Sequence, residues 1–174
     1  LEAGAVTRFT LEDAEAIAKL TETVKCVSPS IFGRAQVVYQ NKNWSTQVMG
    51  TGADYGEMRA SVPVVGKFFT DADVNIKQKV VLLGTTVAQI LFGDENPAGA
   101  MVKINRVNFK VIGVLPQKGA SAFQNQDDVV IVPVTTAMYR LLGKEYVGAI
   151  DVEVKSPALM DAAQEQIREL VIKR

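Results

Sequence analysis

The chain has 174 residues, 48% of them apolar, a length and composition typical of a folded globular protein of one domain or two small ones. Its 19 basic residues balance its 19 acidic residues, so it lacks the charge excess that nucleic-acid-binding proteins use. It has no histidine and one cysteine, which excludes histidine-based acid–base catalysis and an intrachain disulfide. We expect Cys26, among apolar neighbours, to be a buried, unreactive thiol.

The first third of the chain predicts a helix followed by a β-hairpin. Thr10 and Asp13 match the capping-box pattern T-x-x-D, which predicts a helix from about residue 11. Gly52 interrupts the β pattern that follows, and we expect the chain to cross between two subdomains there. The expected β elements are an extended segment at 24–29, a strand at 34–40, a turn at 41–43 and a returning strand at 44–50.

The stretch 80–115 is the most regular part of the sequence. An apolar run at 80–83 has the length of a buried strand, and Gly84 ends it. Thr85 or Thr86 is placed to cap a helix that ends at Gly93. Branched residues then predict two more strands, at 102–107 and 109–115. The stretch therefore predicts a strand, a short helix and two strands.

Two ligand-binding patterns begin in this region without being completed. A dinucleotide site needs three glycines after its first strand, and Gly84 is followed by Thr86 and Gln89 at the other two positions. A D-x-D-x-N pattern at 71–75 resembles the start of a calcium loop, but its sixth position is Ile76 and its twelfth is Leu82, where the ion needs Gly and Glu. Because both patterns lack residues that the ligand needs, we interpret them as structural turns and not as ligand sites.

The last third predicts strand, helix, strand, helix. A polar loop at 116–125 precedes Asp127 and Asp128, and we interpret these acids as two separate structural residues, because neighbours on a strand point to opposite faces. Since the chain starts at Leu1, opens on a capped helix and ends in a helix without a stop signal, we expect it to be a piece of a longer protein. The expected elements are a strand at 129–133, a helix to Gly143, a strand at 147–154 and a helix from Pro157.

Several short motifs recur together in one family. They are NWST at 43–46, GT at 50–51 with Tyr55, GKFFT at 66–70, VVLLGTTVAQILFG at 80–93 with N-P-x-G at 96–99, VIGVL at 111–115, and QDDVVIVP at 126–133 before Thr136. In number and order they resemble the periplasmic core domain of MacB-type ABC transporters, within the wider FtsX-like permease group. The resemblance runs from about Thr10 to Leu170.

The resemblance implies an α+β fold of two subdomains. A split porter-like α/β subdomain is expected from residues 1–58 and 146–174, and a small α/β subdomain of the Sabre type from the inserted residues 59–145. This agrees with the order of predicted elements, in which a helix and strands at each end enclose a central block. The resemblance also implies transmembrane helices before and after this chain.

The resemblance further implies a mechanical role without a catalytic site. ATP and Mg²⁺ are then expected in a separate nucleotide-binding domain, with no cofactor or metal in this chain. The expected partners are a membrane-fusion adaptor, an outer-membrane exit duct reached through it, and a second copy of the transporter, for efflux of macrolides, peptides or similar substrates. In the polar loop 118–126, we predict that Phe123, Gln124 and Gln126 contact the adaptor.

Two other functions remain open. One is a different FtsX-like permease, whose ectodomain serves lipoprotein release or activates cell-wall hydrolases. The other is a small soluble nucleotide-binding protein built around Gly84.

Overall fold

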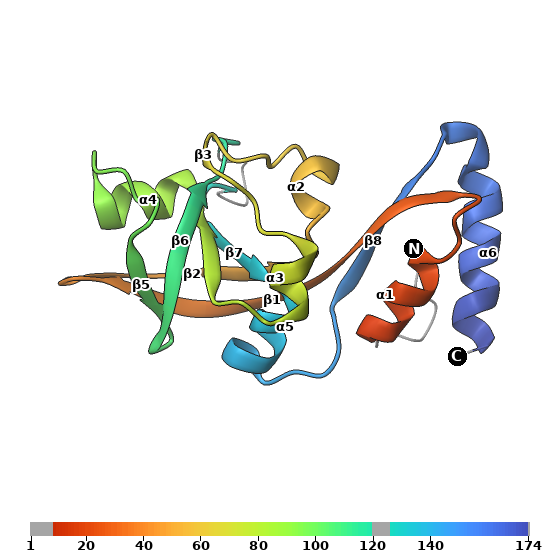
Figure 1. Ribbon diagram of the computed structural model, residues 1–174, viewed down its shortest axis with the longest axis horizontal. Coiled ribbons are helices and arrows are strands. Elements are labelled where there is room, and N and C mark those ends of the chain that lie inside the picture. Colours follow the sequence, from red (N-terminus) through yellow and green to blue (C-terminus); the bar gives the residue numbers. More distant parts are fainter. Residues whose placement is uncertain (1–8, 120–125, 174) are drawn as a thin grey trace.

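The protein has two lobes joined by two long strands (Figure 1). This is a computed structural model, and it describes residues 9–119 and 126–173. The larger lobe contains most of the strands, and the smaller lobe contains the first and last helices. Among the described residues, no helix is both long enough and apolar enough to cross a membrane.

The helices and strands follow the order expected from the sequence. The strands are β1 (Val24–Tyr39), β2 (Lys42–Thr51), β3 (Val65–Gly66), β4 (Val80–Leu83), β5 (Met101–Ile104), β6 (Val107–Val114), β7 (Val129–Pro133) and β8 (Ala149–Val154). The helices are α1 (Leu11–Ala18), α2 (Tyr55–Met58), α3 (Asp71–Asn75), α4 (Thr85–Phe92), α5 (Val134–Thr136), the π-helix η1 (Ala137–Leu142), the 3₁₀ helix η2 (Pro157–Leu159) and α6 (Met160–Lys173).

The strands of the larger lobe pair in a closed ring. Following the hydrogen bonds gives the order β1, β2, β7, β4, β6, β5 and back to β1. The β2–β7 and β4–β6 pairs are parallel, and the other four pairs are antiparallel. The ring closes through Val37 and Val38 of β1, which lie opposite Ile104 and Lys103 of β5. Closure leaves these six strands without a free lengthwise edge.

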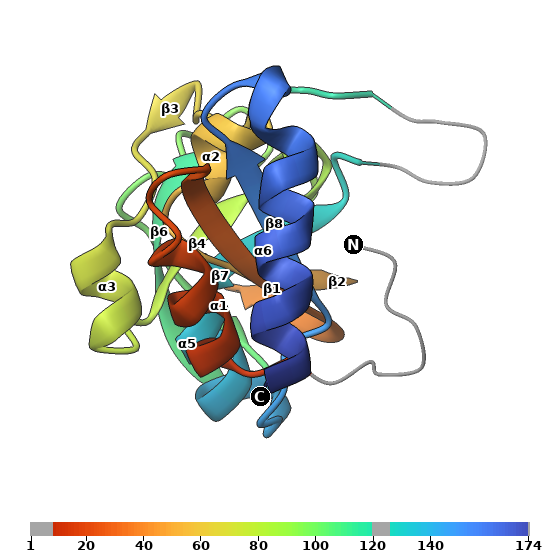
Figure 2. The ribbon, with the colours of Figure 1, turned by 90° about the vertical axis from the view of Figure 1, so that its right-hand side faces the viewer.

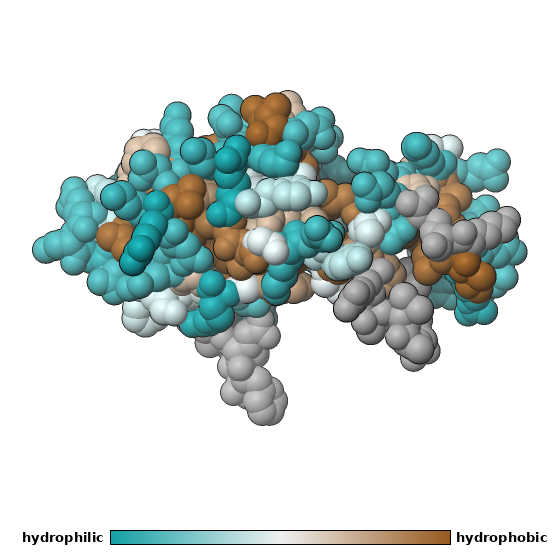
Figure 3. Space-filling model, turned by 90° about the horizontal axis from the view of Figure 1, so that it is seen from below, coloured by the Kyte–Doolittle hydropathy of each residue, from teal (hydrophilic) through white to brown (hydrophobic). Residues whose placement is uncertain are grey.

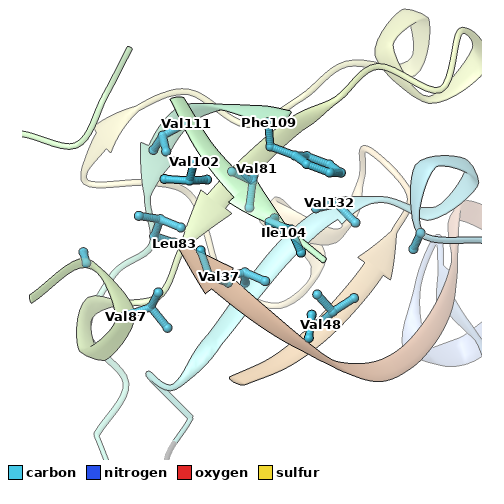
Figure 4. Close-up of a cluster of buried hydrophobic side chains, with 14 of the residues drawn as sticks. Val37, Val48, Val81, Leu83, Val87, Val102, Ile104, Phe109, Val111 and Val132 are labelled. Atoms are coloured by element: carbon cyan, nitrogen blue, oxygen red, sulfur yellow. The ribbon is translucent and has the colours of Figure 1, made fainter. Parts of the chain in front are cut away.

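Alternate residues of the ring point inward and form the main core (Figure 4). On β4, Val81 and Leu83 are fully buried in this core, and Phe109 of β6 is the largest fully buried side chain. Helix α4 and the α5–η1 pair add apolar side chains to the same cluster. This inward set follows from the two-residue period of a β-strand.

The outward residues of β4 and β7 are also buried, because the chain between β2 and β4 covers them. Leu82 and Ile131 pack there against Phe69, which is 3% exposed, and Phe68 is partly buried beside it. Phe69 therefore belongs to this outer core, and Phe68 packs against it.

The smaller lobe is a helical layer on the first part of β1. Residues 24–30 of β1 pair with β8, whereas residues 30–39 pair with β2, so one strand belongs to both lobes. Helices α1 and α6 lie side by side beyond β1 and β8 (Figures 1 and 2), and Ile17, Val24 and Ile167 form their shared core. Helices from the two ends of the chain therefore share one layer.

Of three local features predicted from the sequence, the structure confirms one and corrects two. The capping box of Thr10 and Asp13 is present. The expected 41–43 turn is wrong: Tyr39 lies opposite Lys42, so the turn is Gln40–Asn41, with Gln40 at φ 54°. Helix α4 is capped by Gly84 without a side-chain hydrogen bond, and not by Thr85 or Thr86.

The mixed α/β class is confirmed, while the division into porter-like and Sabre-like subdomains stays a prediction. The boundaries predicted at 58/59 and 145/146 would place β2 in one subdomain and β7 in the other. In the structure these two strands are hydrogen-bonded in parallel from Gln47 and Val129 to Thr51 and Pro133.

Candidate docking surface

Asp127 joins the two ends of the 118–126 segment, the polar loop predicted to contact a partner. Its Oδ1 accepts the Lys118 N–H at 2.7 Å, and its Oδ2 accepts the Gly119 N–H at 2.9 Å. Asp127 is buried, at 6% exposed. Hydrogen bonds to a carboxylate are stronger than those between neutral groups, so the place where this segment meets the ring is well fixed.

Asp128, next to Asp127, forms hydrogen bonds with strand β2. Its Oδ1 accepts the Trp44 Nε1–H at 2.9 Å and the Thr46 hydroxyl at 2.6 Å. The sequence analysis predicted separate structural roles for the two acids, and this is confirmed. Asp127 fixes the backbone eight and nine residues before it, whereas Asp128 fixes side chains of β2 that lie 82 and 84 residues before it.

Lys118 begins a polar connection that leads to the smaller lobe. Its Nζ donates to the Arg59 carbonyl at 2.7 Å, and Arg59 Nη2 donates to Asp151 Oδ1 of β8 at 3.0 Å. Burial and then the charge of Arg59 lower the pKa of Lys118, whereas the hydrogen bond to Asp151 raises the pKa of Arg59. We call Lys118, Arg59 and Asp151 the polar link.

A pocket of about 140 Å³ opens beside the polar link, between α2 and the outer face of β2 and β7. Polar and apolar atoms line it in nearly equal measure, and its polar groups include amides, hydroxyls, the Lys118 ammonium and the Asp127 carboxylate. The lining residues are Gln47, Met49, Tyr55, Ser61, Gly84, Leu115, Pro116, Lys118, Gln126, Asp127, Val129 and Ile131.

The turn at Gly84 has the contacts of a structural turn. Gly84 N–H donates to the Val129 carbonyl at 2.8 Å, and Thr86 N–H donates to the Asp127 carbonyl at 3.1 Å. A Cβ on Gly84 would lie 2.2 Å from the Asp127 carbonyl oxygen, so close packing on the chain requires this glycine. Two N–H groups at the start of α4 are thus already bonded, whereas a phosphate site needs such groups free.

Cys26 is half-buried and bonded to a carboxylate. Its Sγ donates to Glu153 Oε2 at 3.1 Å. Burial, followed by this hydrogen bond and the charge of Glu153, raises the pKa of the thiol to about 12. Since the thiolate is the reactive form, this environment agrees with the predicted unreactive thiol. Within residues 9–119 and 126–173, no group of three or more acidic or cysteine side chains is arranged to hold a metal ion.

The predicted contact residues are only partly visible in the structure. Gln126 is exposed and borders the pocket. Phe123 and Gln124 lie outside the described residues. The sequence analysis missed the polar link and the bond from Trp44 to Asp128, because their members are 59 and more residues apart and form no short motif.

Comparison with known proteins gives a match over nearly the whole chain. The family described as MacB-like periplasmic core domain matches residues 2–170. The macrolide export ATP-binding/permease protein MacB of Chlorobium phaeobacteroides is 52% identical over 172 residues, and that of Bdellovibrio bacteriovorus is 49% identical over 173. The match covers 99% of this chain but 26% and 27% of these relatives, so the chain spans about a quarter of their length.

Two solved structures share the fold. The periplasmic region of MacB from Actinobacillus actinomycetemcomitans superposes with a TM-score of 0.84 at 23% identity, covering 98% of this chain and 76% of that one. The extracellular domain of the noncanonic ABC-type transporter YknZ from Gram-positive bacteria gives a TM-score of 0.81 at 21% identity, covering 94% and 82%. At these identities the likeness concerns the fold alone.

Proposed function

This chain belongs to the family of MacB-like periplasmic core domains, and we propose that it transmits movement between the permease and an adaptor of the membrane-fusion type. It is the periplasmic domain of an ABC transporter permease, as the family and its relatives indicate. In our proposal the 118–126 segment contacts the adaptor, and the rest of the domain carries the displacement.

The observation that supports this role most directly is the way Asp127 and Asp128 fix the 118–126 segment. Asp127 binds the backbone on one side of the segment, and Asp128 binds β2. A force applied at Lys118 or Gly119 therefore acts on the closed ring through Asp127. A contact that has to transmit a rigid-body motion needs such a stiff base.

Besides the chain that enters β8 from η1, two features connect the ring to the smaller lobe. Strand β1 runs through both lobes without a break, and the polar link reaches β8 from Lys118. Helix α6 follows β8 through η2, so a displacement of β8 passes directly to the last helix. This arrangement supports transmission along the long axis seen in Figure 1.

The wider transporter completes the proposal. ATP and Mg²⁺ act in a separate nucleotide-binding domain, two copies of the transporter work as a homodimer, and the adaptor leads to an outer-membrane exit duct. The curated relatives are named for macrolide export and ATP binding, which supports macrolides as one substrate class.

Calorimetric titration of the 174-residue chain with the adaptor encoded beside the transporter tests the proposal. We expect saturable binding at micromolar concentration, weakened at least fivefold when Phe123, Gln124 and Gln126 are all replaced by Ala. The matched control replaces the exposed Asn41, Lys42 and Asn43 of the β1–β2 hairpin by Ala and should bind as the parent does. Absence of binding, both here and with the full-length transporter, would contradict adaptor docking.

The alternative FtsX-like roles, in lipoprotein release or hydrolase activation, use another partner on the same kind of domain. The shared fold with the YknZ extracellular domain shows that the architecture is found in more than one transporter type. Saturable binding to a lipoprotein carrier or a cell-wall hydrolase, in place of the adaptor, would favour this alternative.

A further inference from the structure

The hairpin of β5 and β6 has one buried face and one exposed face. The inward residues belong to the main core and are Val102, Ile104, Phe109 and Val111. The outward residues that alternate with them are all exposed and are Met101, Lys103, Asn108 and Lys110. The chain that covers the outside of the ring packs on β4, β7 and the last part of β6, so it leaves the outward face of this hairpin open to solvent.

The register of the hairpin brings two cations and one apolar side chain together. Met101, 56% exposed, lies directly opposite Lys110, and Lys103 lies opposite Asn108. Lys103 and Lys110 are therefore diagonal neighbours on one face, a relation that places such residues about 7–8 Å apart. Met101 is the direct neighbour of Lys110 and the next residue on the same side of β5 as Lys103. The exposed face thus has an apolar centre between two ammonium groups.

The turn of the hairpin adds a third cation. Asn105 and Arg106 join the strands and have φ values of 47° and 72°, the signs of a type I′ turn, whose central positions favour Asn and Gly. Asn105 fixes the turn to β1, because its N–H donates to the Gln36 carbonyl at 3.0 Å and its Oδ1 accepts the Gln36 N–H at 3.0 Å. Arg106 is exposed, so the chain has an arginine where glycine would fit the backbone with less strain.

The cationic face, as we call it, comprises Met101, Lys103, Arg106 and Lys110. No acidic residue occurs in the sequence from 96 to 126. The Lys110 N–H donates to the Lys79 carbonyl at 3.0 Å, which brings another exposed lysine next to the face. Asp94 and Glu95 precede the turn into β5, but within the described part of the chain no acid forms an ion pair with the three cations of the face. These charges therefore favour an anionic partner.

The composition of the cationic face favours a protein partner over a lipid surface. Met and Arg are enriched in protein interfaces, where apolar contacts lie among polar groups. Figure 3 shows the larger lobe from below, with its apolar residues in separate groups among hydrophilic ones. The side seen there therefore offers small apolar contacts rather than a broad apolar surface for insertion into a membrane.

We propose that the cationic face binds an acidic segment of a protein partner, with an apolar side chain against Met101 and carboxylates beside the surrounding cations. The proposal rests on the proposed function, in which that partner is the adaptor. Strand β6 begins in the cationic face and ends at Val114, four residues before the 118–126 segment. The face therefore gives the adaptor a second contact on the ring.

Peptide probes test the cationic face independently of any adaptor. The acidic probe is the capped peptide Glu-Glu-Leu-Leu-Glu-Glu, and the basic probe has Lys in place of each Glu. Both are titrated into the 174-residue chain with labelled Met methyl groups. We expect a saturable NMR shift at Met101 with the acidic peptide and at least fivefold weaker binding of the basic peptide. No saturable shift at Met101, or equal binding of the two peptides, would overturn the proposal.

Charge-removing variants locate the site. The triple variant of the face is Lys103→Gln, Arg106→Gln and Lys110→Gln, and the matched control is Lys19→Gln, Lys144→Gln and Lys155→Gln, at three exposed positions outside the hairpin. Both lower the net charge equally, and unfolding in urea checks that both fold. The face variant should weaken acidic-peptide binding at least fivefold, whereas the control should bind as the parent does. Equal weakening by both would show a general charge attraction and overturn the proposal.

Arg106→Gly separates binding from folding. Glycine adopts a positive φ more readily than arginine, so this variant should raise the urea midpoint. It also removes one cation and should weaken acidic-peptide binding at least twofold. A purely structural role for Arg106 would not make stability and binding change in opposite directions. Unchanged binding would overturn the assignment of Arg106 to the cationic face.

Vesicles distinguish a protein partner from a lipid surface. We expect equal mixtures of phosphatidylglycerol and phosphatidylcholine, as vesicles, to sediment no more of the parent chain than of the triple face variant. Sedimentation of the parent alone, without a shift of Met101 by the acidic peptide, would assign the face to a membrane surface and overturn the proposal.

The two triple variants, titrated with the adaptor, separate this inference from the proposed function. Weaker adaptor binding by the face variant, but not by the control, supports both. Adaptor binding that is unchanged in the face variant leaves the proposed function standing and overturns the cationic face as an adaptor contact. If the adaptor does not bind at all while the acidic peptide still shifts Met101, the proposed function fails and the acidic-segment site stands.

Discussion

The larger and smaller lobes bury their apolar side chains in different ways. The ring has two packed faces: an inner core around Phe109 and Leu83, and an outer core around Leu82 beneath the covering chain. The smaller lobe has one core of three buried residues, Ile17, Val24 and Ile167. Its strand β8 has all six residues half-buried and pairs, among the described strands, with β1 alone.

This contrast indicates that the two lobes differ in stability and in their part in transmitting movement. Buried apolar area and closed hydrogen-bonding make the ring the more stable lobe, whereas a small core and an edge strand allow local opening at lower free energy. The partner contacts proposed above lie on the ring, and the smaller lobe receives the displacement through β1 and the polar link. Four experiments test whether the lobes differ in this way.

Phe109→Ala should have the largest effect. The side chain is fully buried inside the ring, and truncating such a residue leaves a cavity that costs about 3–5 kcal/mol. Urea unfolding should show this loss as a lower midpoint of one cooperative transition. Hydrogen exchange should then rise in both lobes, and a rise confined to β5 and β6 would contradict the ring as the common stable unit.

Ile17→Ala should cost less and act locally. Ile17 is 1% exposed in the smaller core, and we expect a loss of about 2 kcal/mol, at the low end for such truncations. Hydrogen exchange should accelerate in α1, β8 and α6 while β4, β6 and β7 stay protected. Equal acceleration of the ring strands would show that the lobes unfold together.

The thiol of Cys26 reports the integrity of the β1–β8 pair. Alkylation by iodoacetamide at pH 8 should be at least tenfold slower in the folded chain than in urea, because the folded pKa is about 12 against an ordinary 9.0. A pKa raised by folding stabilises the fold below pH 9, and that contribution is lost as the pH rises towards 12. Ile17→Ala should speed this alkylation if β8 opens together with α1. Phe109→Ala is the control, compared with Ile17→Ala under conditions where the two variants have the same free energy of unfolding.

The ion pair of Arg59 and Asp151 should contribute least. Its side chains are 57% and 24% exposed, and exposed pairs contribute less than about 1 kcal/mol. A double-mutant cycle of Arg59→Gln and Asp151→Asn should give a small coupling energy that falls with added salt. A coupling well above that value, or one insensitive to salt, would show that the polar link is structural and not an adjustable connection.

The sequence predicted those parts of the candidate site that depend on neighbours in the chain. The polar composition around Gln126 and the separate roles of Asp127 and Asp128 were both visible in it. The partners of Asp128 were not, since Trp44 lies 84 residues before it. The continuity of β1 was hidden as well, because the sequence analysis ended an extended segment at Pro29 and began the next strand at Arg34.

What the sequence determined by itself was local: the capping box at Thr10, the buried strand at 80–83, the helix that ends at Gly93, and the family motifs. These follow from backbone preferences and side-chain periodicity within a few residues. Only the tertiary structure decided that β1 is one strand of 16 residues, with Ser30 where its partner changes from β8 to β2, and that six strands close into a ring. The physical reason is that such pairings join residues far apart in the chain, whose hydrogen bonds and shared burial leave no short-range pattern.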